Sequence, residues 1–259
     1  MENDDVTQSA TSPVHSEGSC LNCGAELAGK FCAECGQPSA TERYRFASLG
    51  REVYGQLRKI DAGTTAKTFW ALFRHPGEFV RGYLSGKRVG YLGPIKYFFY
   101  SFVTQVLFSG FAFWLTNERM FSTSADIDLR FEIVSLVSTA FWGLLWALFY
   151  RRSELNTVEN IVAAIYFVAQ VHFLSVVMQL FLLPFAKISA WVLDYSGFVD
   201  IALTIGYSFY FVRTLFNERI LLLVPKQLIL IVLYVLLFVV TILGDAFLGI
   251  FAHQVLPQA

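Results

Sequence analysis

The chain changes character at residues 81–115, RGYLSGKRVGYLGPIKYFFYSFVTQVLFSGFAFWL. This stretch joins a polar, basic, cysteine-bearing part of the chain to a part that is mostly apolar. Its last twenty or so residues are long enough for a helix to cross roughly 30 Å of hydrocarbon. Pro94 suits the first turn of a helix, where the missing N–H costs nothing. The sequence therefore predicts a membrane-spanning helix that starts at Pro94 or Ile95.

The composition is that of a multi-pass membrane protein. Apolar residues make up 55% of the 259 residues and charged residues 15%, and the 26 Phe exceed what one soluble core of this length needs. The net charge is zero, but residues 41–96 hold eleven Lys/Arg against four Asp/Glu. A basic block beside an apolar segment favours anionic lipid headgroups as its partner, and we expect no nucleic acid.

Five apolar segments are candidates for membrane spans. The first starts at Pro94 or Ile95. The other four cover about 133–150, 161–185, part of 191–216, and 228–251. With the N-terminus inside the cell, seventeen Lys/Arg fall on the cytosolic side and three outside, which is a strong positive-inside bias. We therefore expect an all-α membrane protein of about five transmembrane helices, with a cytoplasmic N-terminus and an external C-terminus.

The chain divides into four parts on this interpretation. Residues 1–19 are acidic and Ser/Thr-rich without an apolar signal-peptide core, so we expect a disordered cytosolic tail. Residues 20–40 form a small zinc ribbon, and residues 41–93 form cytosolic amphipathic helices. Residues 94–259 form the transmembrane bundle.

The most specific chemical signal is a pair of C-x-x-C units with eight residues between them. Four thiolates in two tight turns match a tetrahedral structural zinc site, whose ligands would be Cys20, Cys23, Cys32 and Cys35. The glycine after each unit suits a turn that needs a positive φ. A redox pair or two disulfides are alternatives, but no βαβ unit surrounds the cysteines and a cytosolic location disfavours disulfides.

Basic residues accompany bulky aromatics on the short helices between the ribbon and the first span. We expect membrane-surface contacts from Arg74, Arg81, Lys87, Arg88 and Lys96. The alternative is that these helices pack on the cytosolic ends of the transmembrane bundle.

Polar residues inside membrane-spanning segments are energetically costly, so each one is expected to have a partner or a functional role. His172 falls near the middle of the third predicted span and Gln179 about two turns nearer the outside, while Asp200 and Asp245 fall at comparable depth in the outer half of the last two spans. The four side chains can therefore form one buried cluster. Such a cluster would hold a proton, a cation or a small polar ligand. The alternatives are a neutral His172 bonded to a carbonyl, an Asp200 near the outer interface, and an Asp245 paired with a hydroxyl or a lipid headgroup.

The order of these features resembles an uncharacterised family of bacterial membrane proteins, known as a domain of unknown function, that begins with a short zinc ribbon. The resemblance rests on the two C-x-x-C-G units, His75-Pro76-Gly77, the YLSGKR run at 83–88 and Tyr91-x-x-Pro94. It implies a location in the bacterial inner membrane. It brings no assigned activity.

No nucleophile–base pair, phosphate loop or second set of metal ligands is present in the sequence, so we expect no enzyme. The first interpretation is an inner-membrane protein whose zinc ribbon and interfacial helices recruit or sense a cytosolic protein partner. The alternative is a small transporter or channel built around the intramembrane polar cluster. A homo-oligomer is compatible with either function.

Overall fold

The computed structural model describes residues 18–41, 43–45, 62–116, 129–186 and 191–233, together with Leu236 and Val240. In these residues the protein is helical and has no strand beyond two isolated bridges near the cysteines. The helices are α2 (Ala62–Arg74), α3 (Pro76–Leu84), α4 (Pro94–Thr116), α5 (Leu129–Phe149), α6 (Thr157–Ala186) and α7 (Trp191–Phe216), followed by a helix at Ile220–Leu233.

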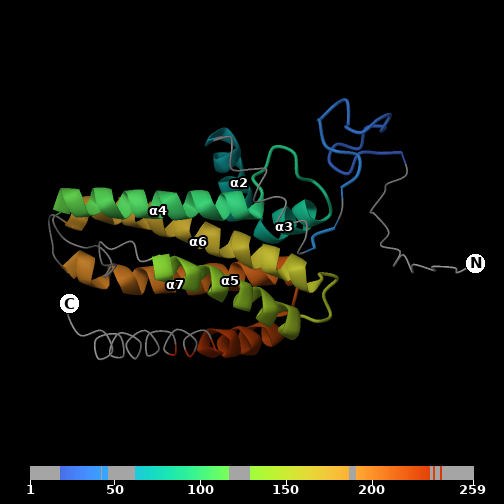
Figure 1. Cartoon of the computed structure of the whole chain (residues 1–259). Coiled ribbons are helices and arrows are strands. Elements are labelled where there is room, and N and C mark those ends of the chain that lie inside the picture. The colour runs from blue at the N-terminus through green and yellow to red at the C-terminus, as the bar shows by residue number, and fades with distance from the viewer. Residues whose placement is uncertain are drawn as a thin grey trace, which may run out of the picture.

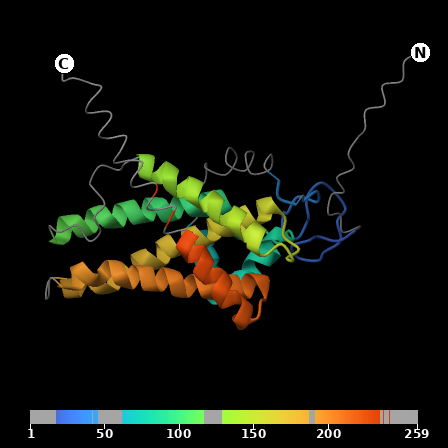
Figure 2. The ribbon, with the colours of Figure 1, turned by 90° about the horizontal axis from the view of Figure 1, so that it is seen from below.

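Four long helices lie side by side, and α6 is the central one (Figure 1). It contacts α4, α5 and α7, while α2 and α3 pack at the end of the bundle where α6 begins and α7 ends. The cysteine-bearing segment lies at this same end in both ribbon views (Figures 1 and 2). We call this the ribbon end of the bundle.

The first half of α6 is buried on all sides. Val162, Ala163, Ala164 and Tyr166 have no exposed surface, although they point in different directions around the helix. Gly143 of α5 allows the closest approach, because a Cβ there would lie 2.5 Å from the Cα of Ile161. Glycine at position 143 therefore lets α5 lie directly against the backbone of α6 at Ile161.

A second close contact joins α3 to the end of α7. Gly77 packs so tightly that a Cβ on it would lie 2.1 Å from the backbone of Thr214. The Arg81 guanidinium donates to the carbonyl oxygens of Thr214 and Leu215 at 2.5 and 2.6 Å. These carbonyls belong to the last turn of α7, where no intrahelical N–H is available, and a cation also complements the helix dipole there.

The predicted helix start at Pro94 is confirmed, and α5, α6 and α7 cover the next three predicted segments. The predicted start of the last helix is wrong. We expected a helix from Leu228 after Pro225, but the helix begins at Ile220 and includes Pro225. Pro225 is the sixth residue of this helix and cannot donate to the carbonyl of Leu221, but the helix continues through it.

Two helical stretches among the described residues are long and apolar enough to cross a membrane, Thr157–Phe185 and Gly197–Phe216. Thr139–Phe149 and Ile220–Leu233 are apolar but shorter. The five-span layout, with its external C-terminus, therefore stays a prediction. The expected disordered tail lies outside the described residues except for Gly18 and Ser19. Of the segment expected to form amphipathic helices, 41–93, residues 42 and 46–61 lie outside them as well.

The contact at Gly77 makes a direct test of the packing of α3 on α7. Gly77→Ala should destabilise the protein by about 1–3 kcal/mol, because the added methyl overlaps the α7 backbone, which cannot move aside like a flexible side chain. The measurement is thermal unfolding in detergent. Gly82→Ala on the same helix is the control, since the nearest atom to its Cβ is 3.8 Å away, and it should leave stability unchanged or raise it by up to about 1 kcal/mol, because alanine favours a helix more than glycine does. Equal effects of the two variants would contradict this packing.

Candidate metal centre

Two similar turns present the four cysteines. In the first, the N–H of Gly24 donates to the carbonyl of Cys20 at 2.8 Å, and in the second the N–H of Gly36 donates to the carbonyl of Cys32 at 2.9 Å. Gly24 and Gly36 have φ angles of +80° and +73°, so the predicted need for a positive φ after each C-x-x-C unit is confirmed. An isolated antiparallel bridge closes each turn, Ser19 with Glu26 and Phe31 with Pro38.

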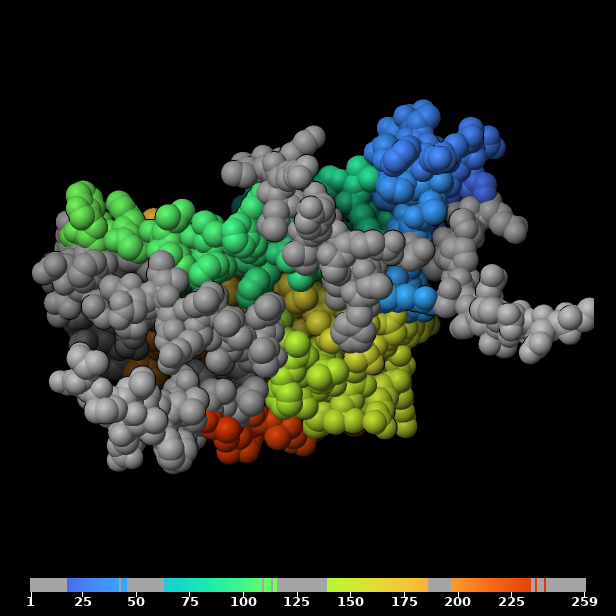
Figure 3. Space-filling model, in the orientation of Figure 1, coloured from blue at the N-terminus to red at the C-terminus, as the bar shows by residue number. Residues whose placement is uncertain are grey.

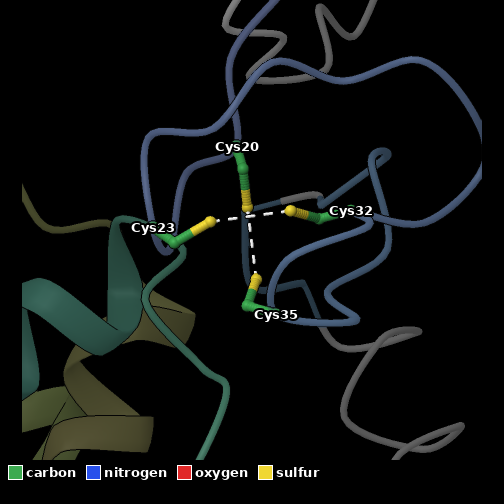
Figure 4. A group of neighbouring side chains, drawn as sticks. All are labelled: Cys20, Cys23, Cys32 and Cys35. Carbon is green, nitrogen blue, oxygen red and sulfur yellow. Dashed lines mark hydrogen bonds between the residues drawn. The ribbon is translucent and has the colours of Figure 1, made fainter.

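The sulfur atoms of the two turns converge on one point (Figure 4). All four lie within 4.8 Å of one another, with 3.6 Å between the sulfurs of Cys20 and Cys35 and 3.5 Å between those of Cys23 and Cys32. A tetrahedral site with metal–sulfur bonds of about 2.3 Å places its sulfurs about 3.8 Å apart. The four cysteines are free thiols and are not paired as disulfides. The cluster can therefore hold one metal ion.

The environment of the thiols shows why a cation suits the cluster. Backbone N–H groups of Cys23 and Asn22 point at the sulfur of Cys20 and lower its pKa to about 6. The N–H of Ala25 favours the Cys23 thiolate, but the neighbouring sulfur of Cys32 and burial outweigh it and raise the pKa of Cys23 to about 12. A metal ion in place of the protons removes the repulsion between thiolates, so metal binding is coupled to proton release.

Both turns contact the loop between α3 and α4, residues 85–93. The side-chain oxygen of Asn22, inside the first C-x-x-C unit, accepts from the N–H of Val89 at 3.3 Å. The side-chain oxygen of Gln37, just after the second unit, accepts from the N–H of Arg88 at 3.4 Å. We call residues 85–93 the docking loop.

A glycine of the docking loop fits against the first turn. Gly86 has a φ of +114°, and a Cβ on it would lie 2.8 Å from the Leu21 side chain. The position therefore requires glycine for its backbone conformation and for its contact with the metal-binding turn.

The residues that follow the ribbon fix it to the bundle. Tyr44 is 2% exposed, its hydroxyl donates to that of Tyr83 on α3, and the Arg88 guanidinium lies 4.4 Å from its ring centre. Arg43 donates twice to the Glu159 carboxylate, at 2.7 and 2.8 Å, which raises the pKa of the Arg43 guanidinium. The ribbon and its linker thus contact α3, the docking loop and α6.

Glu159 also organises the start of α6. Its carboxylate accepts from the N–H of Asn156 at 2.8 Å, and the Asn156 side chain accepts from the N–H of Glu159 at 2.9 Å. This is a reciprocal capping box with asparagine at the N-cap. Sequence reasoning missed both residues, although Asn-x-x-Glu before an apolar run is a helix-start signal that could have located them.

The predicted membrane-surface cations have different surroundings. Arg74 and Lys87 are exposed, and the guanidinium of Arg74 lies 5.3 Å from the ring centre of Trp70. Arg81 binds the end of α7 and Arg88 contacts Tyr44, as described above. Lys96 is only 9% exposed and lies 5.6 Å from the ring centre of Tyr100. Their contact with lipid stays a prediction.

The predicted polar cluster stays a prediction. Gln179 donates to the Ser175 hydroxyl on the same helix at 3.0 Å, and Asp200 of α7 lies near Ser175. His172 contacts Ser101 of α4 at 3.4 Å instead. Asp245 lies outside the described residues.

Metal content gives the first test of the cysteine cluster. We expect about one metal ion per chain. After the metal is removed, the affinity of the protein for the metal should fall as the pH is lowered. It should fall more steeply below about pH 6, because Cys20 then also takes up a proton. Elemental analysis and a chelator competition at several pH values measure this.

Cys35→Ser should remove most of the metal, while Glu34→Gln, an exposed position within the same C-x-x-C unit, should keep it. A metal content that Cys35→Ser leaves unchanged would contradict the assignment.

Comparison with known proteins adds one family. Residues 65–106, from α2 through the docking loop into α4, match the family described as "Protein of unknown function (DUF3667)". No curated protein and no solved structure matches the chain. The match includes the His75-Pro76-Gly77 step, the YLSGKR run and Pro94, and it does not include the cysteines. The helices that surround the docking loop are therefore the part of this chain that is similar to that family.

Proposed function

We propose that the protein is a non-enzymatic membrane protein whose zinc ribbon, docked on the cytosolic end of a helical bundle, recruits or senses a cytosolic protein partner. The observation that carries this proposal is the contact of both metal-binding turns with the docking loop. The loop connects directly to α4, so the metal site and the bundle share one interface. The bundle supplies the anchor, and the ribbon supplies the recognition surface.

The distribution of exposed apolar side chains supports a membrane location. Over the half of the bundle away from the ribbon end, α4, α6 and α7 expose large apolar residues, namely Leu107, Phe111, Trp114, Val177, Leu180, Phe181, Phe185, Phe198, Val199 and Ile201. Soluble proteins rarely expose a continuous apolar surface of this kind. In Figure 3 the ribbon stands at the opposite end of the molecule from the far end of α4.

Charge supports the orientation. The ribbon end carries Arg151 and Arg152 after α5, and Arg213, Arg219 and Lys226 lie near the end of α7. In membrane proteins, short basic loops of this kind remain on the cytosolic side. The ribbon would then lie in the cytosol, and a bacterial inner membrane is the location that fits a reduced metal site of four thiols.

Zinc is the metal that this ligand set favours. Four thiolates in tetrahedral geometry and two C-x-x-C turns are typical of structural zinc, and no position remains for a catalytic water. With such a site the metal stabilises the fold of the ribbon. Metal loss would then release Asn22 and Gln37 from the docking loop.

Phe31 marks the surface on which a partner would bind. It is 64% exposed although it directly precedes the buried Cys32. An exposed aromatic side chain on a rigid, metal-stabilised turn is a typical anchor for a protein interface. An anionic lipid surface would lie alongside, next to the exposed Trp70, Phe73 and Arg74 of α2.

Transport is a second candidate function. The observation that favours it is a group of polar side chains on two helices that are long enough to cross a membrane: Gln179 donates to Ser175 on α6, and Asp200 of α7 lies near Ser175. Polar groups in such helices often mark ion pathways. Flux in proteoliposomes separates the two candidates, since a recruiting or sensing protein needs none.

The coupling between metal and bundle predicts a change in hydrogen exchange. Removing the metal with a chelator should speed exchange of the Arg88 and Val89 amides about fivefold to tenfold, because each loses a hydrogen bond to a ribbon side chain. Mass spectrometry of peptides covering 85–93 measures it. Peptides from the buried part of α6 should not change. Equal protection of the docking loop with and without metal would contradict the coupling.

Recruitment is tested by affinity purification from cells in mild detergent with four forms of the full chain, the intact chain and three variants. The intact chain should retain a cytosolic protein that Cys35→Ser loses. Phe31→Ala should keep the metal but also lose the partner, because it removes only the exposed side chain. Asp200→Asn should retain the partner. Retention by the Phe31→Ala and Cys35→Ser variants alike would show that the ribbon does not recruit.

A further inference from the structure

Helix α2 presents basic and aromatic side chains to the outside of the protein at the ribbon end. Lys67, Trp70 and Arg74 are three and four residues apart, so they lie on one side of the helix, and Phe73 lies beside them. All four are exposed, Trp70 by 51% and Phe73 by 45%. The helix contains no acidic residue. We call these four residues the α2 stripe, which is both positively charged and apolar.

The opposite side of α2 is fixed to the bundle. The Tyr207 hydroxyl of α7 donates to the carbonyl of Leu72 at 3.0 Å, and the Gln170 side chain of α6 donates to the carbonyl of Phe69 at 3.4 Å. The helix is directed across the long axis of α4 (Figure 1). If the long helices follow the membrane normal, α2 therefore lies along the membrane surface with its stripe uncovered.

The stripe has the chemistry of a segment in the headgroup layer of a membrane. Trp and the long stems of Lys and Arg are typical of that layer, because their apolar parts meet the acyl chains while their polar ends meet phosphate. The guanidinium of Arg74 lies 5.3 Å from the ring centre of Trp70, so charge and apolar surface occur together. A negatively charged phospholipid headgroup complements two cations on a helix without an acid.

Lys67 also joins the stripe to the docking loop. Its ammonium group lies 4.6 Å from the ring centre of Tyr91, and a Cβ on Gly90 would lie 2.9 Å from Nζ. One residue further on, the Thr68 hydroxyl accepts from the N–H of Leu92 at 3.0 Å. The ribbon contacts the earlier part of this loop, at Gly86, Arg88 and Val89. The docking loop thus contacts the metal-binding turns with one part and α2 with the other.

We propose that the α2 stripe binds anionic phospholipid headgroups through Lys67 and Arg74, and that this binding strengthens the contact between the ribbon and the docking loop. A lipid that holds α2 at the surface keeps residues 67 and 68 in place against the end of the loop, which keeps its start in place for the ribbon. By linkage, a docked ribbon favours lipid binding in turn. The proposal rests on the membrane location proposed above, but it does not require the recruitment of a partner.

Hydrogen exchange of the full, metal-bound chain in lipid nanodiscs tests both parts. One set of nanodiscs contains phosphatidylcholine alone, and the other contains equal parts of phosphatidylcholine and phosphatidylglycerol, so that the two differ in charge. Amides in peptides covering 62–74 should exchange about tenfold more slowly in the anionic nanodiscs, and those covering 85–93 about threefold more slowly. High salt should weaken both effects, because it screens the attraction between exposed cations and headgroups.

Two double variants make the test specific to the stripe. Lys67→Gln with Arg74→Gln should remove both lipid effects. Arg151→Gln with Arg152→Gln removes the same charge from the loop after α5 and should leave both effects unchanged. If the first double variant fails to fold, Lys67→Gln alone should remove the effect on 85–93 and keep part of the effect on 62–74, because Arg74 remains.

Three outcomes would overturn the proposal. Equal exchange in the two lipids would show that the stripe does not read lipid charge and is free for a protein or a second copy of the chain. A lipid effect that survives the loss of both cations would remove the stripe as its cause. An effect confined to 62–74 would remove the link to the ribbon. Recruitment of a cytosolic partner is not measured, so its failure leaves these results unchanged, whereas a chain that does not enter nanodiscs would refute the membrane location itself.

Discussion

The complete burial of the first half of α6 is the constraint on which the other contacts depend. A helix segment without exposed surface needs protein on every side, and the start of α4 together with α5, α7, α2 and α3 supplies it at the ribbon end. The carboxylate of Glu159, at the start of α6, is buried. It caps the helix and also needs a cation as a partner, because an unpaired buried charge is costly. Arg43 supplies that cation from the linker of the ribbon. The ribbon is therefore fixed to the helix that forms the centre of the bundle.

On the proposed function, the metal site acts mechanically and not by chemistry. The metal fixes the two turns, the turns present Asn22 and Gln37 to the docking loop, and the loop leads into α4 through Gly90 and Pro94. Loops usually tolerate movement, but this loop is held by backbone N–H groups that donate to ribbon side chains. A change in metal occupancy or a partner on the ribbon would thus act at the start of α4.

Sequence reasoning reached the features that depend on local residue types. The metal-binding turns follow from cysteine spacing and from the glycines after each unit, and the start of α4 follows from Pro94. It could not reach contacts between distant segments. Arg81 was expected at lipid headgroups because it stands beside aromatics, but in the structure its guanidinium contacts the end of α7, more than a hundred residues away. The Arg43–Glu159 pair escaped for the same reason. The start of the last helix was misplaced because Pro225 was taken as a boundary, whereas the helix runs through this proline from Ile220 to Leu233.

The central claim is that the metal-bound ribbon rests on the docking loop, and a photo-crosslink from Leu21 tests it most directly. Leu21 faces Gly86, and photoleucine has nearly the shape of leucine, so the substitution disturbs little. With metal bound, illumination should attach residue 21 to peptides from 85–93, and chelation should abolish the product. A crosslink to other parts of the chain in the metal-bound protein, or one that chelation leaves unchanged, would contradict the account.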